Sequence, residues 1–259
     1  MEFVNLYTLS EYSLLESSNH INKLLKKAKD YKYSSLAITD VNNTSGLFKF
    51  YNKAKELSIK PILGINISIK SDYFNSLLLY AKNIQGYQNI LEIASYKTNS
   101  PIISLEQLTN KCDDIVGIIP SCENEVIKLF YENNLIAAGL KLNEYKNIIK
   151  DLYLGIDLQS EKNNRNIQSL INFANNNDIK CVAINKTIYL EKEDVDVYKV
   201  LRCIDLGINE YALKESEDKM FLLNQNEAIN LFKEFPDLIK NTKVISDKCN
   251  VTIDFSLNE

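Results

Sequence analysis

The side chains that most often carry out chemistry are sparse in this sequence. It contains one histidine, His20, and five cysteines, at positions 112, 122, 181, 203 and 249, which show no CxxC spacing. An odd number of cysteines without that spacing argues against both a zinc knuckle and a disulfide framework. His20 lies at the start of a predicted helix and has no nucleophilic partner near it in sequence, and the seven glycines form no phosphate-binding loop. The sequence therefore predicts neither a catalytic triad nor a phosphate loop.

The remaining candidates for chemistry are carboxylates that follow predicted strands. Metal-assisted hydrolysis needs neutral imidazoles and carboxylates that converge on each ion, so that bound water becomes a nucleophile near neutral pH. Asp40 follows one short apolar run, and Glu16 follows another. Asp40 could equally be an Asx-turn residue, Glu16 a surface residue near a helix entry, and Cys122 an ordinary thiol. The residues alone leave these alternatives open.

Short apolar runs rich in Ile, Val, Leu and Tyr recur along the first two thirds of the chain and predict strands. Amphipathic helical patterns lie between most of them, whereas the gap around residues 71–72 is too short for a helix and indicates a turn. This alternation predicts an α/β fold with a largely parallel sheet, closed into a barrel rather than left as an open doubly wound sheet. The runs are Phe3–Tyr7, Ser35–Ile38, Pro61–Ile69, Leu77–Ala81, Ile115–Ile119, Leu152–Ile156 and Lys180–Ile184.

After residue 189 the pattern changes to helices alone. Val197, Val200, Leu201 and Ile204 share one face of a predicted helix. Asn224 is followed three residues later by a glutamate, the arrangement of a capping box. A further amphipathic stretch runs to residue 249, and the last ten residues look extended without an end signal, which indicates that a longer polypeptide could continue from here.

Composition excludes several classes of protein. The net charge of −4 and the pI near 5.3 give no sign of the basic surface of a self-sufficient nucleic-acid binder, so any DNA contact would be local or supplied by other parts. No signal peptide is present, and no apolar run approaches the roughly 20 residues that span a bilayer. We expect a soluble, cytoplasmic protein without a membrane partner.

Five strings, in order and spacing, resemble the N-terminal polymerase-and-histidinol-phosphatase (PHP) domain of the bacterial replicative DNA polymerase III alpha subunit. The resemblance covers nearly the whole chain. It implies a distorted seven-stranded (β/α)7 barrel with extra C-terminal helices, which in some members holds three metal ions that support phosphoester hydrolysis. The strings are FVNLYTLSEYSLLES, LAITDVNNTSG, IKPILGINISI, LLLYAKNIQGYQNI and VAINKTIYLEKEDVDVYKVL.

The same resemblance implies that most of the family's metal ligands have been replaced. Hydrocarbon, amide or ammonium groups stand where imidazoles or carboxylates are expected, and only Asp40, Glu16 in place of the usual Asp, and Cys122 through a gapped alignment could still bind a metal. The family's His-x-His pair matches Tyr7 and Leu9, a further His matches Asn5, Thr-Asp-His matches Thr39, Asp40 and Val41, a Glu matches Asn66, another His falls near Asn75 or Ser76, and Asp-x-His matches Lys186, Thr187 and Ile188.

These replacements predict a catalytically silent PHP domain, a structural and interaction platform in DNA replication. The alternatives are an active metal-dependent phosphoesterase or 3′–5′ proofreading exonuclease, and a free-standing barrel that binds a small ligand. The resemblance implies no cofactor in this fragment, with magnesium in a polymerase core absent from it. The implied partners are that core, a proofreading exonuclease and other replisome subunits, with DNA bound only by the full-length protein.

Two further expectations follow from the resemblance. The barrel domain should span residues 1–225, and a C-terminal helical segment over residues 226–259 should lead toward the absent polymerase core. Because Asp40, Glu16 and Lys186 all follow barrel strands, we expect the Lys186 ammonium to occupy roughly the former metal position and to pair with Asp40, with Glu16, or with both.

Overall fold

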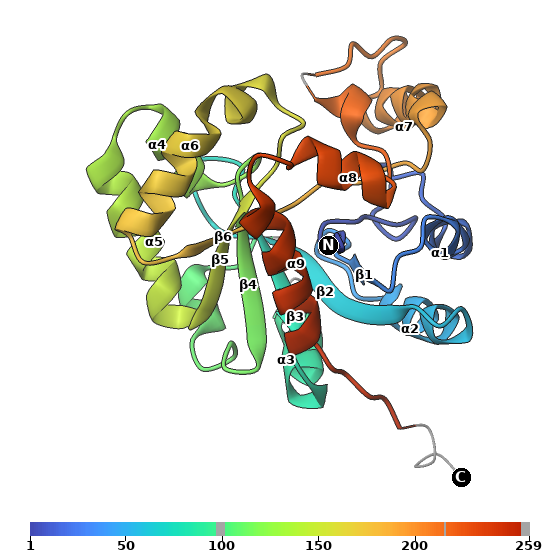
Figure 1. The fold of residues 1–259 in the computed structure, drawn as a ribbon, viewed down its shortest axis with the longest axis horizontal. Helices are drawn as coiled ribbons and strands as arrows, with labels where there is room; N and C mark the ends of the chain where they lie inside the picture. Colours follow the sequence, from blue (N-terminus) through green and yellow to red (C-terminus); the bar gives the residue numbers. More distant parts are fainter. Residues whose placement is uncertain (97–101, 215, 255–259) are drawn as a thin grey trace.

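The computed structural model describes residues 1–96, 102–214 and 216–254. Its centre is a six-stranded sheet whose strands lie in the order of the sequence, and the sheet curls so that helices surround it (Figure 1). The strands are β1 Ser35–Ile38, β2 Lys60–Ser68, β3 Ser76–Ala81, β4 Ile115–Pro120, β5 Asp151–Ile156 and β6 Lys180–Ala183.

The helices follow the predicted amphipathic pattern in the first two thirds of the chain. In α1, for example, the buried residues are Ile21, Leu24, Leu25 and Ala28, one face at helical spacing. The helices are α1 Ile21–Asp30, α2 Leu47–Glu56, α3 Ile84–Ser95, α4 Glu125–Tyr131, α5 Leu135–Ile148, α6 Glu161–Asn176, α7 Val195–Leu206, α8 Gln225–Leu231 and α9 Pro236–Lys248.

Most neighbouring strands are parallel, as predicted. β1 pairs with β2, β4 with β5, and β5 with β6 in parallel, whereas β3 runs antiparallel to both β2 and β4. The link between β2 and β3 is only residues 69–75, which is too short for the crossover that a parallel pair would need. The predicted turn at residues 71–72 therefore reverses the chain.

The strands are buried on both faces, as in sheets covered by helices. In β3, Leu77 and Leu79 pack among the outer helices, whereas Leu78 and Tyr80 pack in the interior that the curled sheet encloses. Tyr80 also donates a hydrogen bond to the carbonyl oxygen of Leu6. The N-terminal segment thus belongs to this interior core.

The prediction of a seventh strand at Phe3–Tyr7 is wrong, because this segment is not a strand. It nevertheless lies between β1 and the residues that follow β6. The Ala37 N–H donates to the Asn5 carbonyl at 3.1 Å, and the Thr187 N–H donates to the Tyr7 carbonyl at 2.9 Å. The structure therefore has six strands and one irregular segment bonded on both sides, in place of the expected barrel of seven strands.

The side chain of Asn5 explains why the segment is irregular. Its Oδ1 accepts the Tyr7 N–H at 3.2 Å, and its Nδ2 donates to Thr187 Oγ1 at 2.8 Å. A short amide side chain that binds a nearby backbone N–H takes that donor away from a strand ladder. A matched metal-ligand position thus serves here to shape the backbone.

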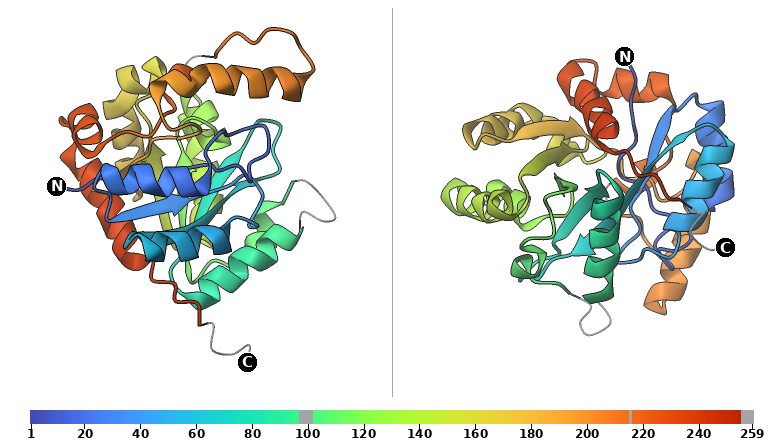
Figure 2. Two further views of the ribbon diagram at one scale, coloured as in Figure 1. Left: turned by 90° about the vertical axis from the view of Figure 1, so that its right-hand side faces the viewer. Right: turned by 90° about the horizontal axis from the view of Figure 1, so that it is seen from below.

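Helix α7 leaves most of its predicted apolar face uncovered. Val197, Val200 and Ile204 are 52%, 59% and 62% exposed, and the residue of α7 that is buried is Tyr198. Figure 2 shows α7 at the edge of the molecule, with little of the fold against its outer side. The helix is therefore anchored through its tyrosine and leaves its aliphatic face in solvent.

Helix α9, by contrast, is part of the core. Ile239, Thr242 and Ile245 are fully buried, and the helix packs against β6. Thr242 Oγ1 accepts the Val4 N–H at 3.0 Å, which joins α9 to the N-terminal segment. The boundary at residues 225–226 stays a prediction. Among the described residues, no helix combines the length and apolar character needed to cross a membrane.

Candidate functional site

A cavity of about 860 Å³ opens where the strands reach their C-terminal ends. Side chains from α7 and from the segment that follows it form part of its wall. Asn75, one of the two positions at which a family histidine could fall, also lines the cavity. Six other positions matched to family metal ligands line it as well. These six are Leu9, Glu16, Val41, Cys122, Lys186 and Ile188.

The other matched positions are buried in the protein rather than exposed to the cavity. They can therefore affect the cavity only indirectly, through the side chains that line it or through the backbone. They are Asn5, Tyr7, Asp40, Asn66 and Ser76.

An ion pair occupies the centre of this arrangement. Lys186 Nζ contacts Glu123 Oε1, with 13% and 18% of the two side chains exposed. The Tyr7 hydroxyl donates to the other carboxylate oxygen, Oε2, at 2.6 Å, and Asn66 Nδ2 donates to that hydroxyl at 2.9 Å. Three positions matched to metal ligands are thereby joined through one carboxylate, and Lys186 Nζ lies 5.4 Å from the centre of the Tyr7 ring.

The backbone of Lys186 is held in place from β5. Gln159 lies just beyond the end of β5, its Nε2 donates to the Lys186 carbonyl at 2.9 Å, and its Oε1 accepts the Lys186 N–H at 3.2 Å. A side-chain amide that forms both bonds fixes the direction in which Lys186 leaves the strand end. The fold therefore holds the backbone from which the Lys186 side chain reaches Glu123.

The ion pair changes the pKa of both partners in the favourable direction. Burial by itself would raise the pKa of Glu123, but the Lys186 ammonium and the Tyr7 hydroxyl outweigh it and hold that pKa below its usual value. Burial by itself would lower the pKa of Lys186, but the Glu123 carboxylate outweighs it and raises that pKa. Burial, and then the nearby Glu123 charge, also raise the pKa of Tyr7. The pair is therefore charged, and the phenol is neutral.

The expected pair between Lys186 and Asp40 is wrong. Asp40 instead accepts the Ser10 N–H at 2.6 Å, the Ser10 hydroxyl at 2.7 Å and the Ser13 hydroxyl at 2.6 Å. Burial raises the pKa of Asp40, and these hydrogen bonds offset part of the rise. Asp40 thus fixes the loop that contains both serines, because its carboxylate is bonded to them and not to Lys186.

Glu16 lies at the cavity, half-buried, and is not the fully solvated residue that its sequence context allowed. Burial raises its pKa, and the positive charge of Lys186 offsets part of this rise. Of the two expected carboxylate partners of Lys186, Glu16 is therefore the one that interacts with it, by charge rather than by a direct ion pair.

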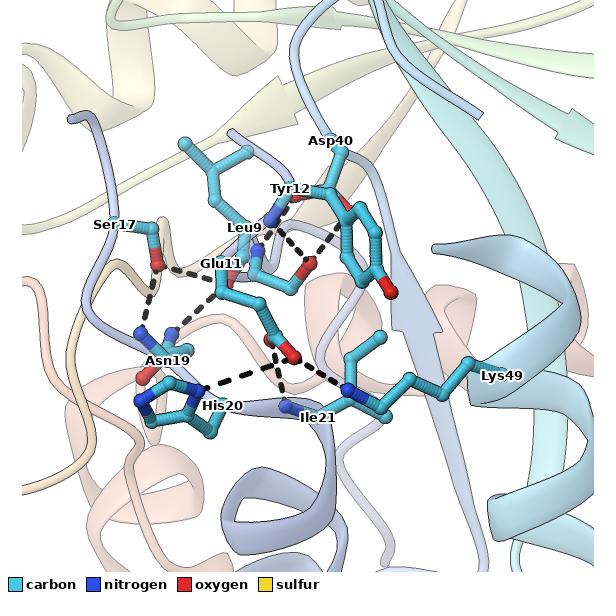
Figure 3. Close-up of polar contacts among 10 residues, drawn as sticks. Leu9, Glu11, Tyr12, Ser17, Asn19, His20, Ile21, Asp40 and Lys49 are labelled. Carbon is cyan, nitrogen blue, oxygen red and sulfur yellow. Dashed lines mark hydrogen bonds and ion pairs between the residues drawn. The ribbon is translucent and has the colours of Figure 1, made fainter. Parts of the chain in front are cut away.

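The loop that carries Leu9 is held by buried side chains from the residues before α1. Ser17 donates to the carbonyls of Leu9 and Ile188, at 3.1 and 2.8 Å, and Asn19 Nδ2 donates to the Leu9 carbonyl at 2.9 Å (Figure 3). The two hydrocarbon side chains at the cavity wall are thus fixed through their backbones.

His20 is a solvated residue at the start of α1, as expected. Its side chain is 64% exposed, and Nδ1 lies 3.9 Å from Glu11 Oε1. Glu11 accepts the first N–H of α1, from Ile21, at 2.8 Å, and also pairs with Lys49 at 2.8 Å (Figure 3). Cys122 is an exposed thiol at the cavity.

Two carboxylates near the strand ends were missed from the sequence. Glu123 follows β4, and Asp157 follows β5, where it accepts a hydrogen bond from Ser121 Oγ at 2.8 Å and another from Asn163. Their position directly after predicted strands was the available signal, because side chains there gather at one end of the sheet.

The donors at this cavity do not fit the family's metal centre. Among the described residues, no three or more His, Cys, Asp or Glu side chains are placed to hold an ion together. Both oxygens of Glu123 are already bonded, and the ammonium of Lys186 repels cations at the centre. What this arrangement can do is join the ends of β4 and β6 with the N-terminal segment.

Comparison with known proteins relates this geometry to a family. The chain is 29% identical over 266 residues to the DNA polymerase III subunit alpha of Halalkalibacterium halodurans, covering 98% of this chain and 23% of that protein. It is 27% identical over 270 residues to the DNA polymerase III subunit alpha of Borreliella burgdorferi, covering 96% of this chain and 24% of that protein. The chain thus spans about a quarter of the length of these relatives.

Among solved structures, an amidohydrolase from Chromobacterium violaceum superposes with a TM-score of 0.46 at 10% identity, over 72% of this chain and 87% of that one. So distant a likeness has no bearing on chemistry. The model of the PHP domain matches residues 5–161 of the sequence. Because this match covers more than half of the 259 residues, the chain belongs to the PHP domain family.

Proposed function

We propose that this chain is the PHP portion of a bacterial DNA polymerase III alpha subunit, in which the former metal pocket is catalytically silent and the domain is a structural platform. The observation that carries the proposal is the bonding of Tyr7 and Lys186 to the two oxygens of Glu123, with Asn66 bonded to the Tyr7 hydroxyl. Two positions that would hold metal ions are thus bonded to one carboxylate, so the strand ends are joined without an ion.

The exposed face of α7 supports the platform role. Val197, Val200 and Ile204 form an aliphatic stripe at helical spacing, and contiguous exposed apolar surface marks a site of protein contact. The relatives extend well beyond the length that this chain matches. We assign the stripe to the remainder of the polymerase polypeptide, which would also bind DNA and magnesium. A proofreading exonuclease and other replisome subunits are further partners in this proposal.

The silent pocket predicts that the chain binds no stoichiometric transition metal and hydrolyses neither aryl phosphates nor single-stranded DNA ends. Elemental analysis after incubation with manganese and zinc and removal of free ions measures the first. Release of p-nitrophenol and shortening of a 3′-labelled oligonucleotide measure the second. Two or more tightly held ions per chain, or turnover that tracks the purified protein, would show that the active phosphoesterase or exonuclease alternative is right.

The central ion pair predicts a large effect of removing its cation. Lys186→Met leaves the Glu123 carboxylate mostly buried without its counter-charge, so the free energy of unfolding should fall by about 3 kcal/mol. Adding Glu123→Gln should recover part of this loss. Adding Asp40→Asn instead should give effects that sum to within about 0.5 kcal/mol, because Asp40 has other partners. Urea unfolding measures the parent, the Lys186→Met and Asp40→Asn single variants and both double variants. A Lys186→Met protein as stable as the parent would refute the internal role of the lysine.

Glu16 predicts a pH dependence of stability. Because its pKa is raised in the folded state, the folded chain holds this proton after the unfolded chain has lost it at about pH 4.3. In the parent, the contribution of Glu16 to the free energy of unfolding therefore falls as pH rises from the unfolded pKa through the folded pKa. Glu16→Gln does not titrate, so it should show no such fall. The stability of the variant relative to the parent should increase across that window. Glu193→Gln, at an exposed surface residue, is the matched control. A difference that stays flat or declines with pH would contradict the assignment.

The platform role predicts that one charge on α7 blocks assembly. Val200→Glu places a carboxylate on an exposed position, so the fold should be kept while association with the separately produced remainder of the polymerase is lost on size exclusion. Ile136→Glu, on the 82% exposed Ile136 of α5, is the matched control and should still associate. If the parent chain does not associate at tens of micromolar, or if only the α5 variant fails, α7 is not the docking surface.

A further inference from the structure

Positive charge is concentrated in one part of this acidic chain. Residues 21–60 contain nine lysines and three acidic residues, a local charge of +6 in a chain whose total is −4. One of the three acids is Asp40, which is buried and bonded to serines, so it does not neutralise the surface. The overall acidity of the protein hides this local excess.

The structure places the exposed lysines of this stretch on two adjacent helices. α1 and α2 pack against each other, and both views in Figure 2 show them side by side on the outside of the sheet near β1. Both helices bury the face that points to the sheet and turn the other toward solvent. We call these exposed side chains the lysine face: Lys23, Lys26, Lys29, Lys32, Lys49 and Lys55.

The lysine face differs from the other helical surfaces of the protein in how its charge is balanced. Helices α4 to α7 and α9 all carry Lys or Arg paired with an acid three or four residues away on the same helix. α2 has one such pair, between Lys53 and Glu56, and within α1 the described residues form none. Of the lysine face, only Lys49 forms a salt bridge in the described part of the chain, to Glu11. Most of its ammonium groups thus lack a carboxylate partner.

The carboxylates near this face are few. Asp30 ends α1 and is exposed, and Glu56 ends α2 beside Lys53. Neither helix has an acidic residue in its first turn, where Asp or Glu would be stabilising. Lysines three residues apart on α1 also repel one another. Lys29 and Lys55 interact favourably with the C-terminal ends of their helices, and Lys27 of α1, beside the face, pairs with Glu191. The remaining unpaired ammonium groups of the face are available to a bound polyanion.

We propose that the lysine face binds the phosphate backbone of duplex DNA without reading its sequence. Lys23, Lys26 and Lys29 are spread over about 9 Å along the helix axis, a length of duplex axis over which one DNA strand carries about three phosphates. Lysine is a flexible point charge, and contacts of this kind position a protein on DNA without selecting bases. The lysine face lies on the outer side of two packed helices, which favours an extended polyanion over a small anion held in a cavity.

This inference goes beyond the proposed function, which assigns DNA to the rest of the polymerase, and it does not depend on the state of the cavity. DNA is chosen over other polyanions because the relatives are DNA polymerase III alpha subunits. The two proposals can fail separately. The pocket could be silent in a chain that does not bind DNA, and it could be active in a chain that does.

Fluorescence anisotropy of a labelled 20-base-pair duplex, titrated with the 259-residue chain between 50 and 200 mM KCl, tests the proposal. The parent should bind, and the logarithm of its affinity should fall linearly with the logarithm of salt concentration. Combining Lys23→Gln, Lys26→Gln and Lys29→Gln should weaken binding roughly ten-fold or more at 50 mM KCl, and should reduce the salt slope by about 2 to 3, near 0.9 per lost phosphate contact.

A matched triple variant separates the lysine face from overall charge. Lys150→Gln, Lys180→Gln and Lys233→Gln change three exposed lysines elsewhere, and together they should leave affinity and salt slope as in the parent. Asp30→Asn removes a negative charge from the face and should tighten binding. Circular dichroism verifies that each variant is folded.

Three results would overturn the proposal. The parent could show no binding at 50 mM KCl, the two triple variants could weaken binding equally, or the chain could bind vesicles of anionic phospholipid but not the duplex. The last result would assign the face to a membrane surface. Gain of affinity in Asp30→Asn keeps the proposal testable even if the first triple variant fails to fold.

Discussion

Lys186 and Glu123 follow β6 and β4 and form an ion pair in the lining of the cavity, where the Tyr7 hydroxyl donates to the other oxygen of the carboxylate. A cation fixed at this point by the protein itself repels any metal ion and satisfies the acid that would otherwise be buried and unpaired. Other polar groups at the strand ends interact with this ion pair or with one another. Glu16 interacts with the same ammonium by charge.

In the proposed silent pocket, a side chain takes the place of an ion. A metal ion bound among strand ends would hold ligands from several strands at once and so give those ends a common partner. Here the partner is Glu123, which receives one group from the N-terminal segment and one from the end of β6. Asp40 takes a different course and fixes the loop of Ser10 and Ser13. The former ligand positions have thus been divided between two separate networks.

The outer surfaces complement the filled pocket. α7 exposes an aliphatic stripe, α1 and α2 expose lysines without matching acids, and most other helices balance their charges internally. Both surfaces are the ones that we propose as contact sites. α1 and α7 lie on the same side of the fold (Figure 1), and Lys27 of α1 pairs with Glu191 just before α7.

The sequence by itself determined the order of helices and strands, the α/β class, the family and the loss of histidines at the pocket, because periodicity and residue identity are local properties. Six of the seven predicted strands are present, and the reversed β3 followed from a link too short for a crossover. Only the tertiary structure decided that Phe3–Tyr7 is not a strand, since the Asn5 side chain competes for a backbone donor there. It also decided that α7 turns its aliphatic face outward and that Lys186 pairs with Glu123 rather than Asp40. Partner choice depends on which strand ends and loops reach the same point in space, and residues 63 positions apart in the chain carry no local signal that they will meet.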